Sequence, residues 1–414
     1  MKVSYIYSAC IVVETKDLRI CCDPWFEDGI YEGSWFQYPK VANPTSAIGS
    51  LDYIFISHIH PDHYDPIWIR KLLDINPSCR LIIGIENQRH LQKKMIRDGF
   101  QPEGFSTLRV GGTVLTCVPN NRDYSESIDS ALVVRHGKQA VINMNDCPFD
   151  SRQVEEVITL CKGAEVAAFL PYAGAGPYPQ RYRFSSEHER AMAANSKQGQ
   201  FLHLFAKYVE AFKPKVAVPF AGLYYLGGSL REFNKSRGIP DALVAAKGKP
   251  GVGVVLEEER GQIDLDEFSI VHERTTEFDL SAIETYLDTH ASAPFAYEEL
   301  PKPNPDDLFS DLRKALTAAF NRSTLRIEAW ICLSLGDGSF GCAWLNEGRD
   351  VIRLNDIDSL SPREEIHIDS RLLKGLMDRT YHWNNAEIGS HFEFNRVGMG
   401  YSKSLYDLLS FLHL

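Results

Sequence analysis

Basic charge is scarce in this chain. Its 414 residues include 44 lysines and arginines against 55 aspartates and glutamates, which gives a formal net charge of −11 with histidine neutral. A protein that binds DNA or RNA needs a basic face, because lysine and arginine displace the counterions that surround phosphates. The composition therefore argues against nucleic acid as a partner.

Long hydrophobic runs are also missing. The sequence contains no stretch of about 18 consecutive apolar residues, the length that spans a bilayer. Its first residues, MKVSYIYSACIVVE, carry charges at Lys2 and Glu14 and lack the small-residue cleavage site of a secretory signal. We therefore expect no membrane association and a cytoplasmic location.

Cysteine pairs are absent as well. The nine cysteines form no Cys-x-x-Cys pair and no Cys-x-His pair. An iron–sulfur cluster needs cysteines, or cysteines and histidines, at such fixed spacings. We therefore expect no Rieske cluster in this chain. Most of the cysteines lie inside apolar runs, which is typical of reduced thiols in a core.

The chain does contain a regular alternation of strand-like and helix-like segments. Up to about residue 240, β-rich runs such as DYIFISH alternate with helical patterns such as QGQFLHLFAKYVEAF. This alternation favours an α/β layered fold. Residues 240–305 are polar and rich in proline and charge, and we expect a linker or surface crossing there. The remaining residues favour a smaller α+β unit. We predict one domain over 1–300 and a second over 301–414 that could close a substrate pocket.

The segment SHIHPDH, residues 57–63, concentrates potential metal ligands directly after a strand-like run. These ligands are His58, His60, Asp62 and His63. Imidazole nitrogens and carboxylate oxygens suit Zn²⁺, Fe²⁺ or Mn²⁺. In an extended segment, residues two apart share a face, so His58 and His60 point together, and Asp62 and His63 curl back as the turn closes. One short segment can therefore line two adjacent metal positions.

This segment resembles the metal motif of the metallo-β-lactamase superfamily, whose fold is an αββα sandwich with a metal site at one edge. SACIVVE followed by DPW is similar to the superfamily's opening hairpin, and Asp23 of DPW resembles an aspartate that orients the metal ligands from behind. Asp146 of VINMNDC stands where the superfamily has a metal-bridging aspartate. The resemblance implies an αββα fold in which Asp23 and Asp146 serve the metal site.

A narrower resemblance extends over most of the chain. The segments DPWF, YIFISHIHPDH, VINMNDC, PYAGAG, YPQRYRFS and KPKVAVPFAGLYY are similar to the part of CMP-N-acetylneuraminate hydroxylases outside their Rieske domain. This resemblance implies iron- and O₂-dependent hydroxylation of a small polar substrate, such as an N-acyl sugar or a nucleotide sugar. Because the chain shows no Rieske cysteines, the electrons would come from a separate donor protein.

Two histidines that hydrolytic members of the superfamily carry are missing. The position before the strand that leads to Asp146 is taken by Ser125, and the candidate substitutes nearby are Asp123, Glu126 and Asp129. The segment AVPFAGLYY holds no histidine either, and the candidate for that role is His391 of GSHFEF. Each candidate taken singly is more often a turn or surface residue. We therefore expect either one well-held metal or two metals with open, oxygen-rich coordination.

Two glycine-bearing loops, PYAGAGPYP and VPFAGLYY, follow strand-like runs and carry aromatic side chains. We interpret them as pocket walls in which Tyr172 and Tyr224 contact substrate; the alternative is turn glycines beside core aromatics. Arg181 and Arg183 follow the first loop and could bind a carboxylate or a phosphate. Trp25, in the aromatic loop DPWF, could either line the substrate entrance or plug the edge of the sandwich.

Three functions are compatible with these residues. The first is an oxygenase, a monooxygenase by resemblance, in which iron is held by His58, His60, Asp62, His63 and Asp146, with His391 as a further ligand. The second is a zinc- or manganese-dependent hydrolase of an amide, ester, lactone or phosphoester, which uses a metal-bound water. The third is a non-catalytic scaffold. The missing histidines and the narrower resemblance favour the oxygenase, with one or two divalent transition metals and iron preferred. The candidate catalytic residues are Asp62, His63 and Asp146.

Overall fold

Two β-sheets form the centre of the larger part of the molecule. The computed structural model describes residues 1–85, 89–120, 128–323, 325–346 and 350–414. The first sheet has eight strands in the order β16-β15-β1-β2-β3-β5-β6-β7. Their bounds are β1 Lys2–Tyr7, β2 Cys10–Glu14, β3 Arg19–Cys22, β5 Tyr53–Ile56, β6 Arg80–Gly84, β7 Glu103–Phe105, β15 Gln262–Asp264 and β16 Ser269–Val271.

The second sheet has six strands in the order β13-β12-β11-β10-β9-β8. Their bounds are β8 Thr107–Val110, β9 Thr113–Pro119, β10 Ser130–His136, β11 Gln139–Asn143, β12 Glu165–Pro171 and β13 Val216–Phe220. The two sheets share one buried apolar cluster, in which Val13 and Phe55 of the first sheet pack with Leu132 and Phe169 of the second. Alternate side chains of each strand meet in this cluster, as expected where two sheets pack face to face.

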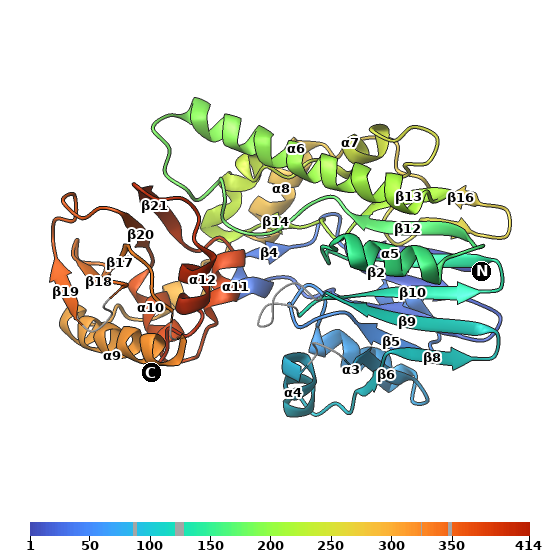
Figure 1. Ribbon diagram of the computed structural model, residues 1–414, viewed down its shortest axis with the longest axis horizontal. Helices are drawn as coiled ribbons and strands as arrows, with labels where there is room; N and C mark the ends of the chain where they lie inside the picture. Colours follow the sequence, from blue (N-terminus) through green and yellow to red (C-terminus); the bar gives the residue numbers. More distant parts are fainter. Residues whose placement is uncertain (86–88, 121–127, 324, 347–349) are drawn as a thin grey trace.

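Helices cover the outer face of each sheet. On the first sheet these are α2 Pro44–Ile48, α3 Pro66–Ile75 and α4 Arg89–Arg97, and on the second sheet α5 Ser151–Leu160, α6 Glu187–Phe212 and α7 Ala242–Lys247. The start of α3 follows from its sequence, because Pro66 occupies the first turn and the Asp65 carboxylate accepts hydrogen bonds from two backbone N–H groups of that turn. The layers therefore run helix, sheet, sheet, helix (Figure 1), which is the αββα arrangement expected from the sequence.

The C-terminal residues form a smaller α+β unit beside the sandwich (Figure 1). Its five strands run in the order β19-β18-β17-β20-β21. The bounds are β17 Trp330–Ser334, β18 Phe340–Trp344, β19 Val351–Leu354, β20 Arg363–His367, β21 Glu393–Val397, α9 Pro305–Ser323, α10 Ser370–Met377, α11 Trp383–Ile388 and α12 Lys403–Leu409. A single buried cluster extends from Ile6 of the sandwich to Leu412 of this unit. The predicted division at residue 300 stays a prediction.

The segment 240–305 is more ordered than its composition suggested. It contributes α7, the hairpin of β15 and β16 at the edge of the first sheet, the helix α8 Leu280–His290 and the 3₁₀ helix η2 Ala296–Glu299. The expectation of a linker over residues 240–305 was therefore wrong, because short hydrophobic stretches between the polar residues pair with existing elements.

Three short elements lie outside this segment. The strands β4 Trp35–Phe36 and β14 Tyr225–Leu226 form a two-stranded ladder, and the 3₁₀ helix η1 Gly228–Ser236 follows β14.

Two further observations concern membranes and thiols. Within the residues that the structure describes, no helix combines the length and the apolar character needed to cross a bilayer. All nine cysteines are free thiols, and eight of them are buried, as expected for core residues.

Candidate metal centre

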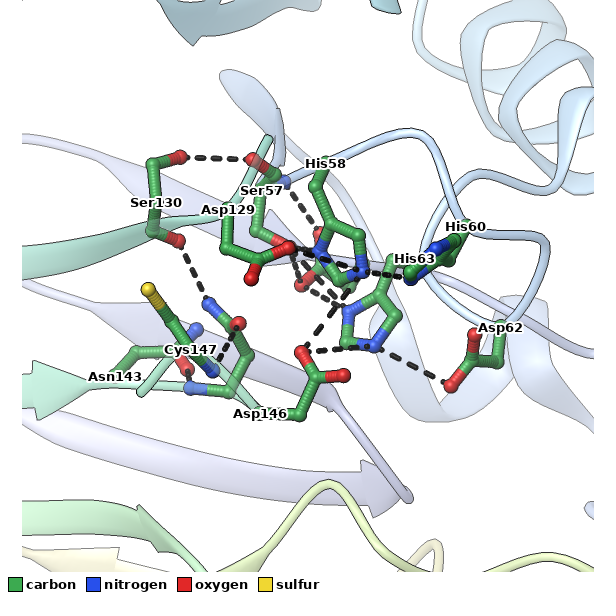
Figure 2. A network of polar contacts seen from close by, with 12 residues as sticks. Ser57, His58, His60, Asp62, His63, Asp129, Ser130, Asn143, Asp146 and Cys147 are labelled. Carbon is green, nitrogen blue, oxygen red and sulfur yellow. Dashed lines mark hydrogen bonds and ion pairs between the residues drawn. The ribbon is translucent and has the colours of Figure 1, made fainter. Parts of the chain in front are cut away.

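The candidate ligands gather where several strands end at one edge of the sandwich. Because β3 and β5 run parallel, Asp23 and the segment that begins at Ser57 both leave the first sheet at the same edge. In the second sheet β11 ends just before Asp146, and the antiparallel strand β10 begins directly after Asp129. The fold therefore brings residues from four strand ends to one locality (Figure 2).

Two overlapping groups of side chains have the geometry to hold a metal ion. One consists of His58, His63 and Asp146, and the other of His58, His60 and Asp129; within each group the ligand atoms lie within 4.8 Å of one another. His58 Nε2 lies 2.9 Å from His60 Nδ1 and 3.8 Å from an Asp129 oxygen. His63 Nε2 lies 3.4 Å from Asp146 Oδ1. The two positions are adjacent, and His58 borders both.

Asp62 adjoins the position of His63 and Asp146. Its Oδ2 lies 3.3 Å from His63 Nε2, while its Oδ1 accepts a 2.5 Å hydrogen bond from the Tyr31 hydroxyl. Figure 2 shows the Asp62 carboxylate pointing toward the His63 ring. If His58 serves the position with His60 and Asp129, the neighbouring position has His63, Asp62 and Asp146.

Hydrogen bonds on the far side of each imidazole select one tautomer. The Ser57 hydroxyl donates to Asp23 Oδ2 at 2.7 Å, so the Ser57 oxygen can accept from His58 Nδ1 at 3.0 Å. His63 Nδ1 donates to the same Asp23 oxygen at 2.9 Å. Because Nδ1 carries a proton in both rings, Nε2 is the nitrogen that each ring points into the cluster. Burial keeps His58 neutral, whereas Asp146 and Asp62 raise the pKa of His63 against the effect of burial, so a metal ion would take the place of the proton on its Nε2.

In His60 the proton lies on the other ring nitrogen, Nε2. Its Nε2 lies 3.2 Å from Asn384 Oδ1, so an N–H at Nε2 donates to that amide oxygen and Nδ1 keeps the lone pair. With these tautomers, lone pairs of His58 Nε2 and His60 Nδ1 face each other across 2.9 Å. Two facing lone pairs repel unless a cation or a proton lies between them, so this arrangement fits a bound metal ion.

The charges of the cluster also fit a cation. Burial lowers the pKa of His58 and His60, which keeps these imidazoles in the neutral form that metals bind. Burial, together with the charge of Asp146, raises the pKa of Asp129 to about 8, and burial likewise raises the pKa of Asp146. His63 Nε2 and Asp146 Oδ1 are buried atoms without a hydrogen-bond partner among the described residues. A divalent cation would satisfy both atoms and offset the crowded carboxylates.

His391, expected as a metal ligand, lies outside both groups. Its Nε2 donates to the Tyr31 backbone oxygen and its Nδ1 accepts from the Tyr297 hydroxyl, each at 2.9 Å. Both ring nitrogens are therefore engaged, and burial lowers the pKa of His391 to about 4. The expected ligation is corrected: the C-terminal unit does reach the site, but His391 is hydrogen-bonded to the backbone of Tyr31, whose hydroxyl donates to Asp62, and both of its nitrogens have other partners.

The two arginines expected to bind substrate are engaged with the C-terminal unit. Arg181 Nε donates to the Phe392 backbone oxygen at 3.2 Å. Arg183 forms ion pairs with Glu393 at 2.5 Å and with Glu365 at 3.3 Å. Their binding of substrate stays a prediction, and the sequence pattern gave no sign of these long-range partners.

The aromatic candidates are packed side chains. Trp25 is 1% exposed and makes an edge contact with Tyr7, which agrees with the alternative that it plugs the sandwich edge. Tyr224 stacks on Trp35 with ring centroids 3.4 Å apart, and Tyr172 is also buried. The structure shows packing contacts for Tyr224 and burial for Tyr172, and the contacts of these two residues with substrate stay predictions.

Sequence reasoning missed two residues that the structure brings to the cluster. Tyr31 was hidden in an aromatic loop, although the flanking glycines of the DGIYEG segment indicated an unusual turn. Asn384 follows His60 by 324 residues and no local pattern connects them. Ser125, Asp123 and Glu126 lie outside the described residues, whereas Asp129, the third candidate substitute, does lie at the cluster.

Comparison with curated proteins finds distant relatives. No family model matches the chain. It is 28% identical over 252 residues to a Mycolicibacterium smegmatis protein described as a Rieske 2Fe-2S iron–sulfur protein, an alignment that covers 58% of this chain and 47% of that protein. It is 22% identical over 237 residues to the inactive cytidine monophosphate-N-acetylneuraminic acid hydroxylase of Homo sapiens, covering 54% of this chain and 45% of that protein. The chain spans about half the length of the curated relatives it matches.

Solved structures give similarly distant likenesses. The diiron β-hydroxylase CmlA of Streptomyces venezuelae is 15% identical, with a TM-score of 0.44 and coverage of 64% of this chain and 54% of that one. A protein described as a possible metal-dependent hydrolase of Veillonella parvula is 14% identical, with a TM-score of 0.45 and coverage of 64% and 99%. The resemblance to CMP-N-acetylneuraminate hydroxylases that the motifs predict is confirmed by the curated relatives, as a similarity over about half of the chain.

Proposed function

We propose that this chain is a metal-dependent enzyme, and that it uses iron and O₂ to hydroxylate a small polar substrate. The observation that carries the proposal is the composition of the candidate groups: His58 and His60 meet Asp129 at one position, and the neighbouring position then keeps His63 with Asp62 and Asp146. Two histidines and one carboxylate on one face of a metal, with open positions opposite, are typical of non-haem iron oxygenases. The proposed ligands are His58, His60, Asp62, His63, Asp129 and Asp146.

The protein's own contribution is orientation. Asp23, together with Ser57, fixes two imidazoles from behind, so the ligand nitrogens are aimed at one locality. About a third of the Asp146 side chain is exposed, at 32%, which leaves the cluster reachable from solvent. When bound, iron supplies the redox chemistry that side chains cannot perform. Among the ligands, Asp62, His63 and Asp146 are the proposed catalytic residues.

The substrate class and the reductant are proposed from the relatives. Similarity, at 22% identity, to proteins named as cytidine monophosphate-N-acetylneuraminic acid hydroxylases supports an N-acyl sugar or a nucleotide sugar as substrate. Hydroxylation by O₂ places one oxygen atom in the product and the other in water, and this balance requires an external electron pair and two protons. We propose a separate electron-donor protein as their source.

Hydrolysis is the second candidate function. It is favoured by the adjacency of the two groups around His58, because neighbouring metal positions also suit a two-metal hydrolase. In that reaction Zn²⁺ or Mn²⁺ would lower the pKa of a bound water to about 7, and Asp62 or Asp146 would orient that water. The carboxylate-rich set, with Asp129 in place of a histidine, favours the first function over this one.

Metal analysis and oxygen uptake separate the two functions. The protein is purified from cultures supplemented with both iron and zinc, its metals are quantified, and O₂ consumption is followed after chemical reduction. We expect iron to be retained and O₂ to be consumed. His60→Ala should abolish both signals, while His203→Ala, a change at an exposed histidine of α6, should leave them intact. Zinc at two equivalents with no response to O₂ would refute the oxygenase.

A further inference from the structure

We propose that Asn384, from helix α11 of the C-terminal unit, is a positioning residue of the metal site that selects the metal-binding tautomer of His60. This inference rests on the proposed metal-binding function of the cluster. It assigns the C-terminal unit a specific task, namely to complete a site whose other parts all come from the sandwich.

The contact between the two residues is direct. His60 Nε2 lies 3.2 Å from Asn384 Oδ1, and Asn384 Nδ2 donates a hydrogen bond to the Tyr406 hydroxyl of α12. In this arrangement the amide nitrogen is directed to the tyrosine and the amide oxygen is presented to the histidine. The amide oxygen accepts but cannot donate, so it selects the His60 tautomer that has its proton on Nε2.

This selection matters because only the opposite nitrogen faces the cluster. His60 Nδ1 lies 2.9 Å from His58 Nε2, in the position shared with Asp129. A ring with its proton on Nδ1 would present an N–H to the metal position and could not ligate. His58 and His63 are each anchored by residues of the sandwich, through Ser57 and Asp23, whereas the anchor of His60 comes from the C-terminal unit.

Helix α11 is itself fixed against the sandwich beside the ligand segment. It packs on the turn α1 Ile30–Gly33, in which Tyr31 and Glu32 have left-handed backbone angles with φ of 52° and 60°. Such angles are unfavourable for residues with a side chain and persist only where the surroundings hold them. The holding contacts include the bond from His391 to the Tyr31 oxygen and the bond from the His382 N–H to the Glu32 carboxylate.

The same turn presents the Tyr31 hydroxyl to Asp62. Residues around α11 thus act on both ends of the ligand segment, on His60 through Asn384 and on Asp62 through Tyr31. Gly389 lies at this contact, and a Cβ added there would come within 2.6 Å of the Tyr31 oxygen. The close approach indicates that the helix and the turn are fitted to each other, so the position of Asn384 relative to His60 is well defined.

The test compares Asn384→Leu with Asn384→Asp in the whole 414-residue chain. Leucine has a similar shape but no acceptor, whereas aspartate retains an oxygen for the His60 N–H. Apo protein is titrated with Co²⁺, and binding is followed by its visible absorption and by competition with a chelator. Loss of a hydrogen-bond partner of a ligating histidine typically weakens metal affinity 10–100-fold. We expect a loss of about that size for Asn384→Leu, a changed absorption spectrum, and substantial rescue by Asn384→Asp.

Asn395→Leu is the matched control. Asn395 lies in the same unit, on β21, and its amide donates to Glu365 at 2.9 Å, away from the cluster. This variant should retain the wild-type affinity and spectrum. Equal Co²⁺ affinity and an unchanged spectrum in Asn384→Leu would overturn the inference, as would equal losses in Asn384→Leu and Asn395→Leu. If the wild-type protein binds no Co²⁺, the proposed metal function fails as well, so the two failures are distinguishable.

Discussion

Replacing His391 by phenylalanine tests whether this buried histidine is a structural fastener. The ring of phenylalanine can keep the contacts with Phe295 and Tyr297, but both hydrogen bonds are lost. The Tyr297 hydroxyl is left without its acceptor in a buried place, which costs about 1–3 kcal/mol. At pH 7.5 we therefore expect His391→Phe to be less stable than the wild type by an amount in this range.

The pH dependence gives a sharper signature. Burial, reinforced by the nearby positive charge of Arg181, lowers the pKa of His391 from 6.5 to about 4 in the folded protein, against the partial opposing effect of its bond to the Tyr31 oxygen. As the pH falls below 6.5 the unfolded chain takes up a proton at this residue and the folded protein does not, so the wild type loses stability. Between pH 7.5 and 5 the loss is about 2 kcal/mol, and it approaches about 3 kcal/mol at lower pH.

The assay is urea unfolding followed by tryptophan fluorescence at a series of pH values, on metal-free wild type and variant. The other titrating groups are common to both proteins and cancel in the difference, which isolates His391. The stability gap should narrow by about 2 kcal/mol as the pH falls from 7.5 to 5. A gap that stays constant would show that His391 is not buried as a neutral ring.

Two further substitutions test the anchoring of the cluster. Asp23→Asn keeps the side-chain volume and tolerates the positive φ of 45° at this position, but only one of its two terminal side-chain atoms can still accept a hydrogen bond, so His63 Nδ1 or Ser57 loses its partner. We expect metal affinity, measured by competition with a chelator, to fall about 10–100-fold. An unchanged affinity would contradict the role of Asp23. Gly389→Ala forces a Cβ within 2.6 Å of the Tyr31 oxygen, whereas the Cβ of the control Gly400→Ala meets nothing within 4 Å. Gly389→Ala should lower both the melting temperature and the Co²⁺ affinity, and Gly400→Ala should change neither. Equal effects of the two substitutions would show that the contact at Gly389 is unimportant.

The sequence was most informative where the site is local. His58, His60, Asp62 and His63 lie within six positions, so their spacing alone predicted two adjacent metal positions. Asp146 and Asp23 were predicted by resemblance, and the structure brings both to the cluster because each follows a strand that ends at the same edge. The layered fold could also be predicted, because the alternation of strands and helices along the sequence restricts the ways in which these elements can pack.

The sequence was least informative where partners are distant along the chain. Arg183 has the composition of an anion-binding residue, and only the folded chain shows that Glu365 and Glu393 already engage it. His391 was correctly associated with the site region but given the wrong task, because sequence cannot show that both of its nitrogens find other partners. Long-range contacts of this kind depend on how the two units pack, and no local periodicity encodes that packing.

The buried cluster shared by the two units gives a physical reason why the proposed metal centre would depend on so remote a residue as Asn384. Ile54 and Ile56 of β5, the strand that carries the ligand segment, belong to the same apolar cluster as Trp383 and Ala386 of α11. A rigid interior transmits displacement, because close-packed side chains have little free space in which to relax. The strand that aims His58 and the helix that anchors His60 therefore share one support, and a shift of either would move one ligand relative to the other. This coupling is the physical reason to treat the C-terminal unit as part of the metal site.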